Sequence, residues 1–337
     1  MRKIQRVRQA IHKALFPILR NLADGRVHSG EELAGMFGLS RASVCNVLAQ
    51  AESLGVKIHA VRGRGYSLPR AIDWLDHNAI RLALAEAADA FALTLVDSVD
   101  STNTLLMRMA ASGAPDGAVV AAEHQQAGRG RRGRRWYASV GGSLTFSVLW
   151  RFDGGLQSMN GLSLVVGLAV ARALDRHSER CVKLKWPNDI LVDYRKLAGI
   201  LIEVQGDMDG AAFAVAGVGV NVRLGEAHRE EIDQAVIDLH EMTVKAGRNQ
   251  LLADCLLEMR HAIQRFRQAG FAALRRDWFE YDAYLGRPVC LRLADDRLVT
   301  GTSEGVDGNG ALVLRMPAGN LQTFHGGEVS LRPGDMA

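Results

Sequence analysis

A segment rich in glycine and arginine, Gly128-Arg129-Gly130-Arg131-Arg132-Gly133, is the start of a run with five arginines in residues 129–135. Guanidinium groups bind phosphate and carboxylate oxygens in pairs, and glycines let the backbone approach a ligand closely. The letters match G-x-G-x-x-G, but a dinucleotide-binding turn requires a helix directly after the third glycine. Here Arg134-Arg135-Trp136-Tyr137 follows and then a predicted strand. We therefore expect a flexible anion-binding loop; a second nucleic-acid patch or a solvated loop is the alternative.

Further polar segments interrupt an otherwise apolar strand pattern near this loop. They are Asp100-Ser101-Thr102-Asn103, Gln125-Gln126, Lys185-Trp186-Pro187-Asn188-Asp189 and Arg195-Lys196-Leu197-Ala198-Gly199-Ile200-Leu201. A single lysine at the head of a strand is ordinarily an edge residue whose amine reaches water, so Lys196 alone would indicate nothing. The combination of these segments indicates a shared binding site.

The first 70 residues have the pattern of helices followed by a hairpin. Leu15, Ile18, Leu19 and Leu22, with Ile11, form one apolar helical face that ends at the Asp24-Gly25 turn. Ser29 with Glu32 predicts a capping box for a short helix through Phe37, and Ser40 is placed to cap a third helix that Gly55 stops. Two short strands, 57–61 and 66–68, are joined by Arg62-Gly63-Arg64-Gly65.

This order of elements is typical of a winged helix-turn-helix that reads DNA. If the helix from Ser40 is the recognition helix, its apolar stripe packs inward and leaves polar residues facing out. The predicted DNA contacts are Arg41, Ser43, Asn46 and Gln50 from this helix and Arg62 and Arg64 from the wing. The alternative is a basic helical domain that docks on the rest of the chain or on another protein.

The middle of the chain alternates helical and strand patterns, as in an α+β or α/β domain. Helices are predicted near 77–89, 101–112, 157–177, 228–240 and 249–268, and strands near 92–97, 117–124, 143–151, 182–186, 189–193, 196–204 and 211–221. The tail from about residue 285 has short strands separated by turn residues, which predicts a small β-barrel. The predicted domains are therefore 1–72, 73–283 and 284–337.

Charge is unevenly distributed along the 337 residues. Residues 1–70 carry 12 Lys and Arg against 4 Asp and Glu, whereas the whole chain has a net charge of only +4. A basic head on a mildly acidic body favours a nucleic-acid contact at the N-terminus. The arginines of the 129–135 loop form a second basic feature, which we assign to the ligand of that loop.

Cysteine usage and hydropathy favour the cytoplasm. The four cysteines, Cys45, Cys181, Cys255 and Cys290, are far apart, which argues against a disulfide framework and a structural zinc site. His12, Lys13 and Arg20 interrupt any signal-peptide core, and the most apolar stretch, 162–174, is shorter than a membrane span requires.

Together, QQAGRGRRGRRW, KWPNDI and RKLAGIL in this order resemble the biotin protein ligases, in particular the bifunctional ligase/repressors of bacteria, over essentially the whole chain. The resemblance implies a central mixed sheet with helices, akin to class II aminoacyl-tRNA synthetases. It also implies ATP-dependent activation of biotin to biotinyl-5′-adenylate and transfer to a lysine of biotin carboxyl carrier protein of acetyl-CoA carboxylase. ATP, biotin and Mg²⁺ are the implied ligands.

The resemblance also assigns roles to individual residues. Ser101, Thr102 and Asn103 match the segment at the ureido end of biotin, Gln125 the glutamine of the same pocket, and Arg129, Gly130 and Arg131 the loop that closes over the adenylate, with Trp136 as its anchor. Lys196 matches the lysine at the biotin carboxylate and reacting phosphate, and Asp189 the aspartate near the incoming lysine. Gly217, Gly219 and Asn221 match the strand end beside the nucleotide.

In the repressors that this chain resembles, bound adenylate acts as corepressor and two subunits pair edge to edge to present two DNA-binding heads. We expect 143–151 to supply part of that edge, because its apolar and polar residues alternate beside the ligand loop. Some members cover the adenine with a tryptophan after the G-x-G-x-N strand; residues 223–239 contain none, and Val236 is the closest match. Three rival hypotheses remain: a ligase whose head no longer regulates, a ligand-sensing transcription factor without catalysis, and a lipoate ligase.

Overall fold

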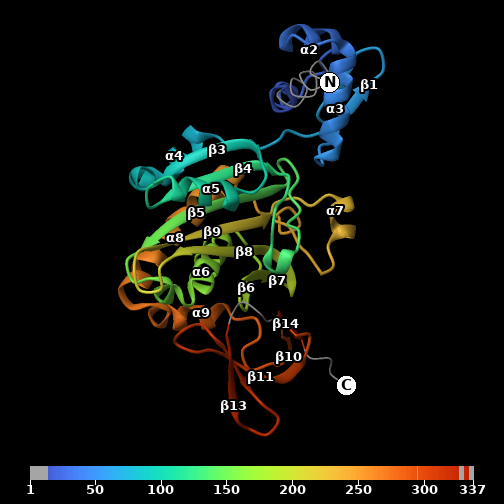
Figure 1. Ribbon diagram of the computed structural model, residues 1–337. Helices are drawn as coiled ribbons and strands as arrows, with labels where there is room; N and C mark the ends of the chain where they lie inside the picture. The colour runs from blue at the N-terminus through green and yellow to red at the C-terminus, as the bar shows by residue number, and fades with distance from the viewer. Residues whose placement is uncertain (1–13, 294, 326–329, 334–337) are drawn as a thin grey trace. The chain divides into compact units, whose positions relative to one another are not determined.

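The computed structural model describes residues 14–293, 295–325 and 330–333, and these form two compact units. One unit consists of the described residues up to Trp74 together with 138–142, and the other of Leu75–Tyr137 and the described residues from Ser143 onward. Figure 1 shows the order of the elements along the chain. No helix in the described ranges is both long and apolar enough to cross a membrane.

The first unit is a winged helix-turn-helix. Residues 14–22 are helical, and α2 (Gly30–Phe37), α3 (Arg41–Ser53), β1 (His59–Val61) and β2 (Gly65–Ser67) follow. Ser29 and Glu32 form the predicted capping box, the Ser40 hydroxyl accepts from the Ser43 N–H, and Gly55 has φ of 81°. The predicted apolar face is confirmed from Leu15 to Leu22, whereas Ile11 lies outside the described residues.

A seven-stranded mixed sheet forms the centre of the second unit. Its order is β3-β4-β5-β9-β8-β7-β6, in which β3 and β4 are parallel and every other neighbouring pair is antiparallel. The strands are β3 (Ala92–Val99), β4 (Ala118–Gln125), β5 (Ser143–Phe152), β6 (Val182–Lys185), β7 (Asp189–Val192), β8 (Arg195–Gly206) and β9 (Ala212–Asn221). All seven lie where the alternating pattern predicts a strand.

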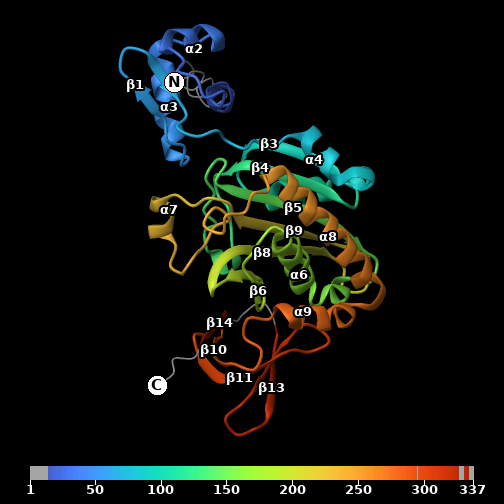
Figure 2. The same ribbon diagram turned by 180° about the vertical axis from the view of Figure 1, so that it is seen from behind.

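Helices cover both faces of this sheet. On one face α4 (His77–Leu84), α6 (Leu162–Asp175) and α8 (Arg248–Ala269) bury the larger core, and Figure 2 shows α8 in front of the sheet. On the other face α5 (Thr102–Ala111) packs against Val120, Leu149 and Val215. The short helices η1 (Ala85–Ala90) and η3 (Leu156–Met159) flank α4 and α6.

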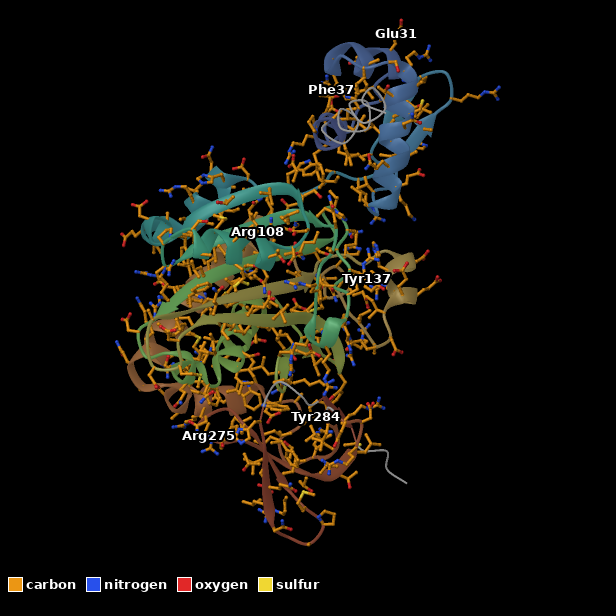
Figure 3. The ribbon with its side chains drawn as sticks, in the orientation of Figure 1. Glu31, Phe37, Arg108, Tyr137, Arg275 and Tyr284 are labelled. Atoms are coloured by element: carbon orange, nitrogen blue, oxygen red, sulfur yellow. The ribbon has the colours of Figure 1, made fainter. Side chains whose placement is uncertain are left out.

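The tail is an antiparallel sheet of five strands in the order β13-β12-β11-β10-β14. Its strands are β10 (Pro288–Arg292), β11 (Leu298–Val306), β12 (Leu312–Arg315), β13 (Leu321–Phe324) and β14 (Ser330–Pro333). No pairing between the two edge strands, which would close a barrel, occurs in the described residues. Helix α9 (Arg275–Tyr281) leads into it, and Arg275 and Tyr284, labelled in Figure 3, flank this junction.

Two expectations from the sequence are wrong. The predicted helix 228–240 is reduced to α7 (Glu226–Glu231), because the chain after it runs beside Lys196 and exchanges backbone hydrogen bonds with it. The expected edge strand, 143–151, lies in the middle of the sheet between β4 and β9. Its alternation reflects two buried faces, one against α6 and α8 and the other against α5, so it offers no free edge.

Candidate functional site

The parallel pair β3 and β4 brings two of the predicted segments together. Val99 pairs with Gln125, so the ends of both strands, and the start of α5 that follows β3, meet at one edge of the sheet. The Gln125 side-chain oxygen accepts from the Thr102 backbone N–H at 2.8 Å and lies 3.2 Å from its hydroxyl. A crossover connection between parallel strands therefore creates this part of the site.

A pocket of about 150 Å³ opens beside these residues. Every residue that the sequence assigned to catalysis or to biotin and nucleotide binding lines it: Ser101, Thr102, Asn103, Gln125, Arg129, Gly130, Arg131, Trp136, Asp189, Lys196, Gly217, Gly219 and Asn221. The lining also includes residues that the sequence did not single out, among them Ile232, Gln234 and Tyr137. Ile232 and Gln234 fall in the segment wrongly predicted as helix, which is why they were missed.

The glycines of β9 make room for two side chains of the site. A Cβ on Gly217 would lie 2.2 Å from the Asn103 Oδ1, and one on Gly219 would lie 2.3 Å from the Trp136 ring. Both distances are far below van der Waals contact. The G-x-G spacing therefore admits the Asn103 amide at one point of the pocket and the Trp136 indole two residues further along the strand.

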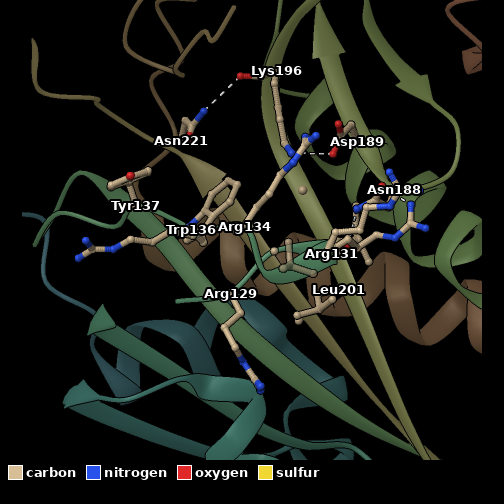
Figure 4. Close-up of a pocket in the computed structure, with 18 of the residues that line it drawn as sticks. Arg129, Arg131, Arg134, Trp136, Tyr137, Asn188, Asp189, Lys196, Leu201 and Asn221 are labelled. Atoms are coloured by element: carbon tan, nitrogen blue, oxygen red, sulfur yellow. Dashed lines mark hydrogen bonds and ion pairs between the residues drawn. The ribbon is translucent and has the colours of Figure 1, made fainter. Parts of the chain in front are cut away.

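Lys196 and Asp189 form an ion pair at one end of the pocket. The Lys196 Nζ lies 2.7 Å from the Asp189 Oδ1, and both side chains are largely buried, with 16% and 14% exposed. The pair results from the hairpin of β7 and β8, which are antiparallel neighbours. Figure 4 shows the Arg131 side chain on the Asp189 side of the pocket, while Arg129 points away.

Arg131 adds a second cation, which is half-buried. Its guanidinium donates to the Asn188 Oδ1 at 3.2 Å. Burial lowers the pKa of Arg131, nearby Asp189 opposes this, and the neighbouring Arg132 and Arg134 lower it further. Since arginine remains charged in proteins, the consequence is a concentration of positive charge that an anion would relieve.

The segment after α7 closes the Lys196 side of the pocket. Lys196 N–H donates to the Ala235 oxygen at 2.8 Å, and the Ile237 N–H donates to the Lys196 oxygen at 3.0 Å. The Asn221 amide donates to the backbone oxygens of Lys196 and Ile237. Val236 therefore lies in the pocket lining. It is the residue that the sequence analysis matched to a tryptophan.

In the first unit, four of the six predicted DNA-contact residues are exposed: Arg41, Asn46, Arg62 and Arg64. Ser43 and Gln50 are half-buried, and the Ser43 hydroxyl lies 2.8 Å from that of Ser40. Val44, Val47 and Leu48 of the same helix are buried, so α3 presents its polar side to solvent as predicted.

Comparisons with known proteins find matches along most of the chain. Three family models match: "HTH domain" over residues 15–67, "Biotin/lipoate A/B protein ligase family" over 95–221 and "Biotin protein ligase C terminal domain" over 284–332. The chain is 38% identical to "Bifunctional ligase/repressor BirA" of Salmonella typhimurium over 312 residues, which covers 92% of this chain and 95% of that protein. The Escherichia coli protein of the same name is also 38% identical, over 311 residues.

A curated enzyme and a solved structure extend the comparison. "Biotin--[acetyl-CoA-carboxylase] ligase" of Mycobacterium tuberculosis is 36% identical over 265 residues, covering 77% of this chain and 96% of that protein. The structure of "Biotin protein ligase from Aquifex aeolicus in complex with biotin and ATP" superposes with a TM-score of 0.61. It is 29% identical, and the match covers 72% of this chain and 99% of that one.

Proposed function

The chain belongs to the family of bifunctional biotin ligase/repressors, and from that premise we propose how its own residues carry out the two activities. It is a homologue of the biotin–[acetyl-CoA-carboxylase] ligases, with a helix-turn-helix head. Biotin and ATP are bound in a homologous ligase structure. We assign residues 1–72 to DNA binding, 73–283 to catalysis and 284–337 to the C-terminal domain.

The ring end of biotin binds among Ser101, Thr102, Asn103 and Gln125. A fused ring system needs an apolar slot with a few fixed hydrogen bonds. All four residues are buried. The Thr102 backbone N–H and hydroxyl both donate to the side-chain oxygen of Gln125. The polar groups are therefore oriented before the ligand arrives.

Lys196 and Arg131 carry the first chemical step. The biotin carboxylate attacks the α-phosphate of ATP, the new bond is a mixed anhydride, and pyrophosphate leaves. Two anions must approach one another for this, so cations must neutralise them and hold them in line. The observation that carries the proposal is the largely buried Lys196 Nζ beside Asp189, at the same end of the pocket as Arg131.

Mg²⁺ fits this site as an ion held mainly by ATP. Asp189 is the one carboxylate in the pocket lining, and no cluster of three metal-binding side chains occurs in the described residues. Mg²⁺ commonly keeps several waters and takes one or two protein carboxylates together with substrate phosphates. Asp189 would hold it, and the ion would supply charge neutralisation at the phosphates.

The loop that contains Arg129, Gly130 and Arg131 closes over the adenylate, with the Trp136 ring packed on Gly219 as its anchor. A mixed anhydride hydrolyses in water, so a cover over it is required. The Trp136 indole N–H is buried and has no hydrogen-bond partner among the described residues, which leaves a donor for the ligand. We place the nucleotide beside Gly217, Gly219 and Asn221, with Val236 on its adenine.

In the second step a lysine of biotin carboxyl carrier protein attacks the anhydride and AMP leaves. The attacking amine must be neutral, and Asp189 is placed to orient it or to take its proton. The test is incubation of the full chain with ATP, Mg²⁺, biotin and apo carrier protein, followed by a streptavidin blot. Labelled carrier is the expected result; its absence with folded protein would refute the ligase assignment and favour a sensor without catalysis. Lipoate in place of biotin tests the lipoate-ligase alternative.

The head binds operator DNA through α3 and the wing, using Arg41, Ser43, Asn46, Gln50, Arg62 and Arg64. One such module binds weakly, so we propose a homodimer that forms when biotinyl-5′-adenylate binds. Strand β7 pairs with β8 only at residues 195–199. In the described structure, the far half of β8, residues 200–206, therefore has a strand neighbour, β9, on one side only. This half of β8 replaces the central strand β5 as the proposed dimer edge.

Gel shifts on the promoter of the biotin-synthesis genes, with and without biotin and ATP, test the repressor activity. A shift that strengthens with both ligands supports it, and a shift that ignores them indicates a head that no longer regulates. Sedimentation of the same samples tests the dimer, since an unchanged monomer fraction would contradict it. ATP, carrier protein and DNA share the cytoplasm, where we place the protein.

A further inference from the structure

Glu203 on β8 contacts two residues of the site without lining the pocket itself. Its Oε2 accepts from the Asn103 Nδ2 at 2.7 Å, and its two carboxylate oxygens lie 3.1 and 3.3 Å from the Arg129 Nη2. The Glu203 side chain is 30% exposed and that of Arg129 is 47% exposed. An exposed ion pair contributes little, so the bond to Asn103 carries the argument.

The carboxylate fixes the orientation of the Asn103 amide. A carboxylate only accepts hydrogen bonds, so the nitrogen of the amide must face Glu203. The same nitrogen donates to the Leu201 oxygen at 3.3 Å, which agrees with that orientation. The Asn103 Oδ1 then faces the Ser147 hydroxyl at 2.6 Å and accepts its proton.

The hydrogen bonds continue from Ser147 to Thr102 at the start of α5. The Thr102 hydroxyl donates its one proton to the Gln125 oxygen at 3.2 Å. The Ser147 hydroxyl, 2.7 Å from that of Thr102, therefore shares its own proton between the Thr102 hydroxyl and the Asn103 oxygen. Gln125 turns its oxygen toward the Thr102 N–H, which leaves its amide N–H₂ for a ligand. A continuous series of hydrogen bonds thus runs from the Glu203 carboxylate through Asn103 and Ser147 to the Thr102 hydroxyl.

These hydrogen bonds matter because the residues that make them are buried. Ser147 is fully buried, Thr102 and Asn103 are 3% exposed and Gln125 is 9% exposed. With little water to exchange with, a reversed hydrogen bond in the chain would leave a buried group unpaired. Glu203 is the one charged residue in this series of hydrogen bonds, and its charge-assisted bond to Asn103 is stronger than the neutral bonds that follow.

We propose that Glu203 is a positioning residue for the ring end of the biotin pocket. It holds the Thr102 hydroxyl in place through Asn103 and Ser147, so that Thr102 and Gln125 are positioned to meet the N–H and C=O groups of the ureido ring. This inference rests on the proposed biotin site. Glu203 touches neither substrate in it and acts through Asn103.

The test is Glu203→Gln in the full chain. A glutamine of the same size has no charge and can donate as well as accept, so the strongest bond that orients the Asn103 amide is lost and only its 3.3 Å bond to the Leu201 oxygen remains. The dissociation constant for biotin, measured by calorimetry without ATP, should rise about tenfold, as expected for loss of a charge-assisted bond. The kcat of ATP–pyrophosphate exchange at saturating biotin should stay within about twofold, because the reacting end of the pocket is unchanged.

Two further variants separate positioning from packing. Glu203→Asp keeps the negative charge and should recover most of the affinity that Glu203→Gln loses. Glu304→Gln removes a similarly exposed carboxylate that pairs with Arg315 in the C-terminal sheet, and should change neither constant. A purely structural role for Glu203 would instead lower thermal stability without a selective change in biotin affinity.

A double-mutant cycle with Ser147→Ala tests the series of hydrogen bonds from Glu203 to Thr102. If the two residues act through Asn103, the double variant should lose less affinity than the product of the two single losses. Independent, multiplicative losses would overturn the proposal, as would wild-type affinity in Glu203→Gln. Failure of the wild type to bind biotin would instead refute the proposed function on which the inference rests.

Discussion

Gly219→Ala tests the role of the glycines in β9. The added Cβ would lie 2.3, 2.5 and 2.7 Å from three atoms of the Trp136 ring, so the indole must move by about 1.2 Å to restore a contact of about 3.5 Å. Overpacking of this kind costs about 1–3 kcal/mol. Trp136 precedes the segment 138–142 and follows the arginine loop, so its displacement changes how the loop covers the nucleotide.

The expected effect is on ATP and not on biotin. A cost of about 1–3 kcal/mol corresponds to about a 5- to 150-fold rise in the KM for ATP in biotin-dependent ATP–pyrophosphate exchange. Biotin affinity, measured without ATP, should change less than about twofold, because the atoms nearest the added Cβ all belong to Trp136 and not to the residues at the ring end of biotin.

Gly167→Ala is the matched control, because its Cβ would lie at an ordinary 3.5 Å from Leu184. The clash also predicts a specific rescue. Adding Gly219→Ala to Trp136→Leu should cost little beyond Trp136→Leu alone, since the smaller side chain removes the clash. An unchanged KM for ATP in Gly219→Ala would show that the contact between Gly219 and Trp136 does not position the loop over the nucleotide.

Three further predictions concern charge. Lys196→Ala should lower ATP–pyrophosphate exchange at least about 100-fold with an unchanged circular dichroism spectrum; near-normal exchange would contradict the role of Lys196. Arg131→Gly should release adenylate about tenfold faster, measured with radiolabelled ATP, because the loop loses its bond to Asn188; unchanged retention would count against the lid. Burial raises the pKa of Asp282 to about 6 from 3.8, so the folded state loses stability as the pH rises through this window. Asp282→Asn should therefore be more stable than wild type by about 3 kcal/mol at pH 7.5 and equal to it near pH 3.5 in thermal melts; equal stability at both would refute the raised pKa of Asp282.

The strands of the central sheet were predictable because their sequences contain the pattern of buried strands. Periodicity reports how much of a strand is buried, however, and not which strands are its neighbours. Residues 143–151 show the limit: their alternation suggested a strand at the dimer edge, whereas β5 lies between β4 and β9 and α5 covers its polar side. The position of a strand in the sheet depends on distant pairings that no local pattern contains.

The segment after α7 was mispredicted for a related reason. Its apolar residues have helical spacing, but Ile237 is fully buried beside Lys196, and Asp238 accepts from the Leu224 N–H and the Arg229 side chain. These contacts with other segments outweigh local helix propensity. They also bring Ile232 and Gln234 into the pocket, which no motif indicated.

Motifs identified the residues that line the pocket but not those that orient them. Lys196, Asp189 and Gln125 stand out as polar residues in apolar strands, and the structure brings all three together. Ser147 and Glu203 fit an ordinary strand pattern, and only the three-dimensional contacts reveal that they hold Asn103. Supporting residues of this kind are recognised by their partners and not by their type.

The central claim is that this pocket forms and retains an acyl-adenylate. The most direct measurement is incubation of the full chain with α-³²P-labelled ATP, Mg²⁺ and biotin without carrier protein, followed by isolation of the protein and its bound label. We expect about one labelled biotinyl-adenylate per chain, formed only with biotin and discharged to AMP when apo carrier is added. Folded protein that acquires no biotin-dependent label, or a label that the carrier does not discharge, would contradict it.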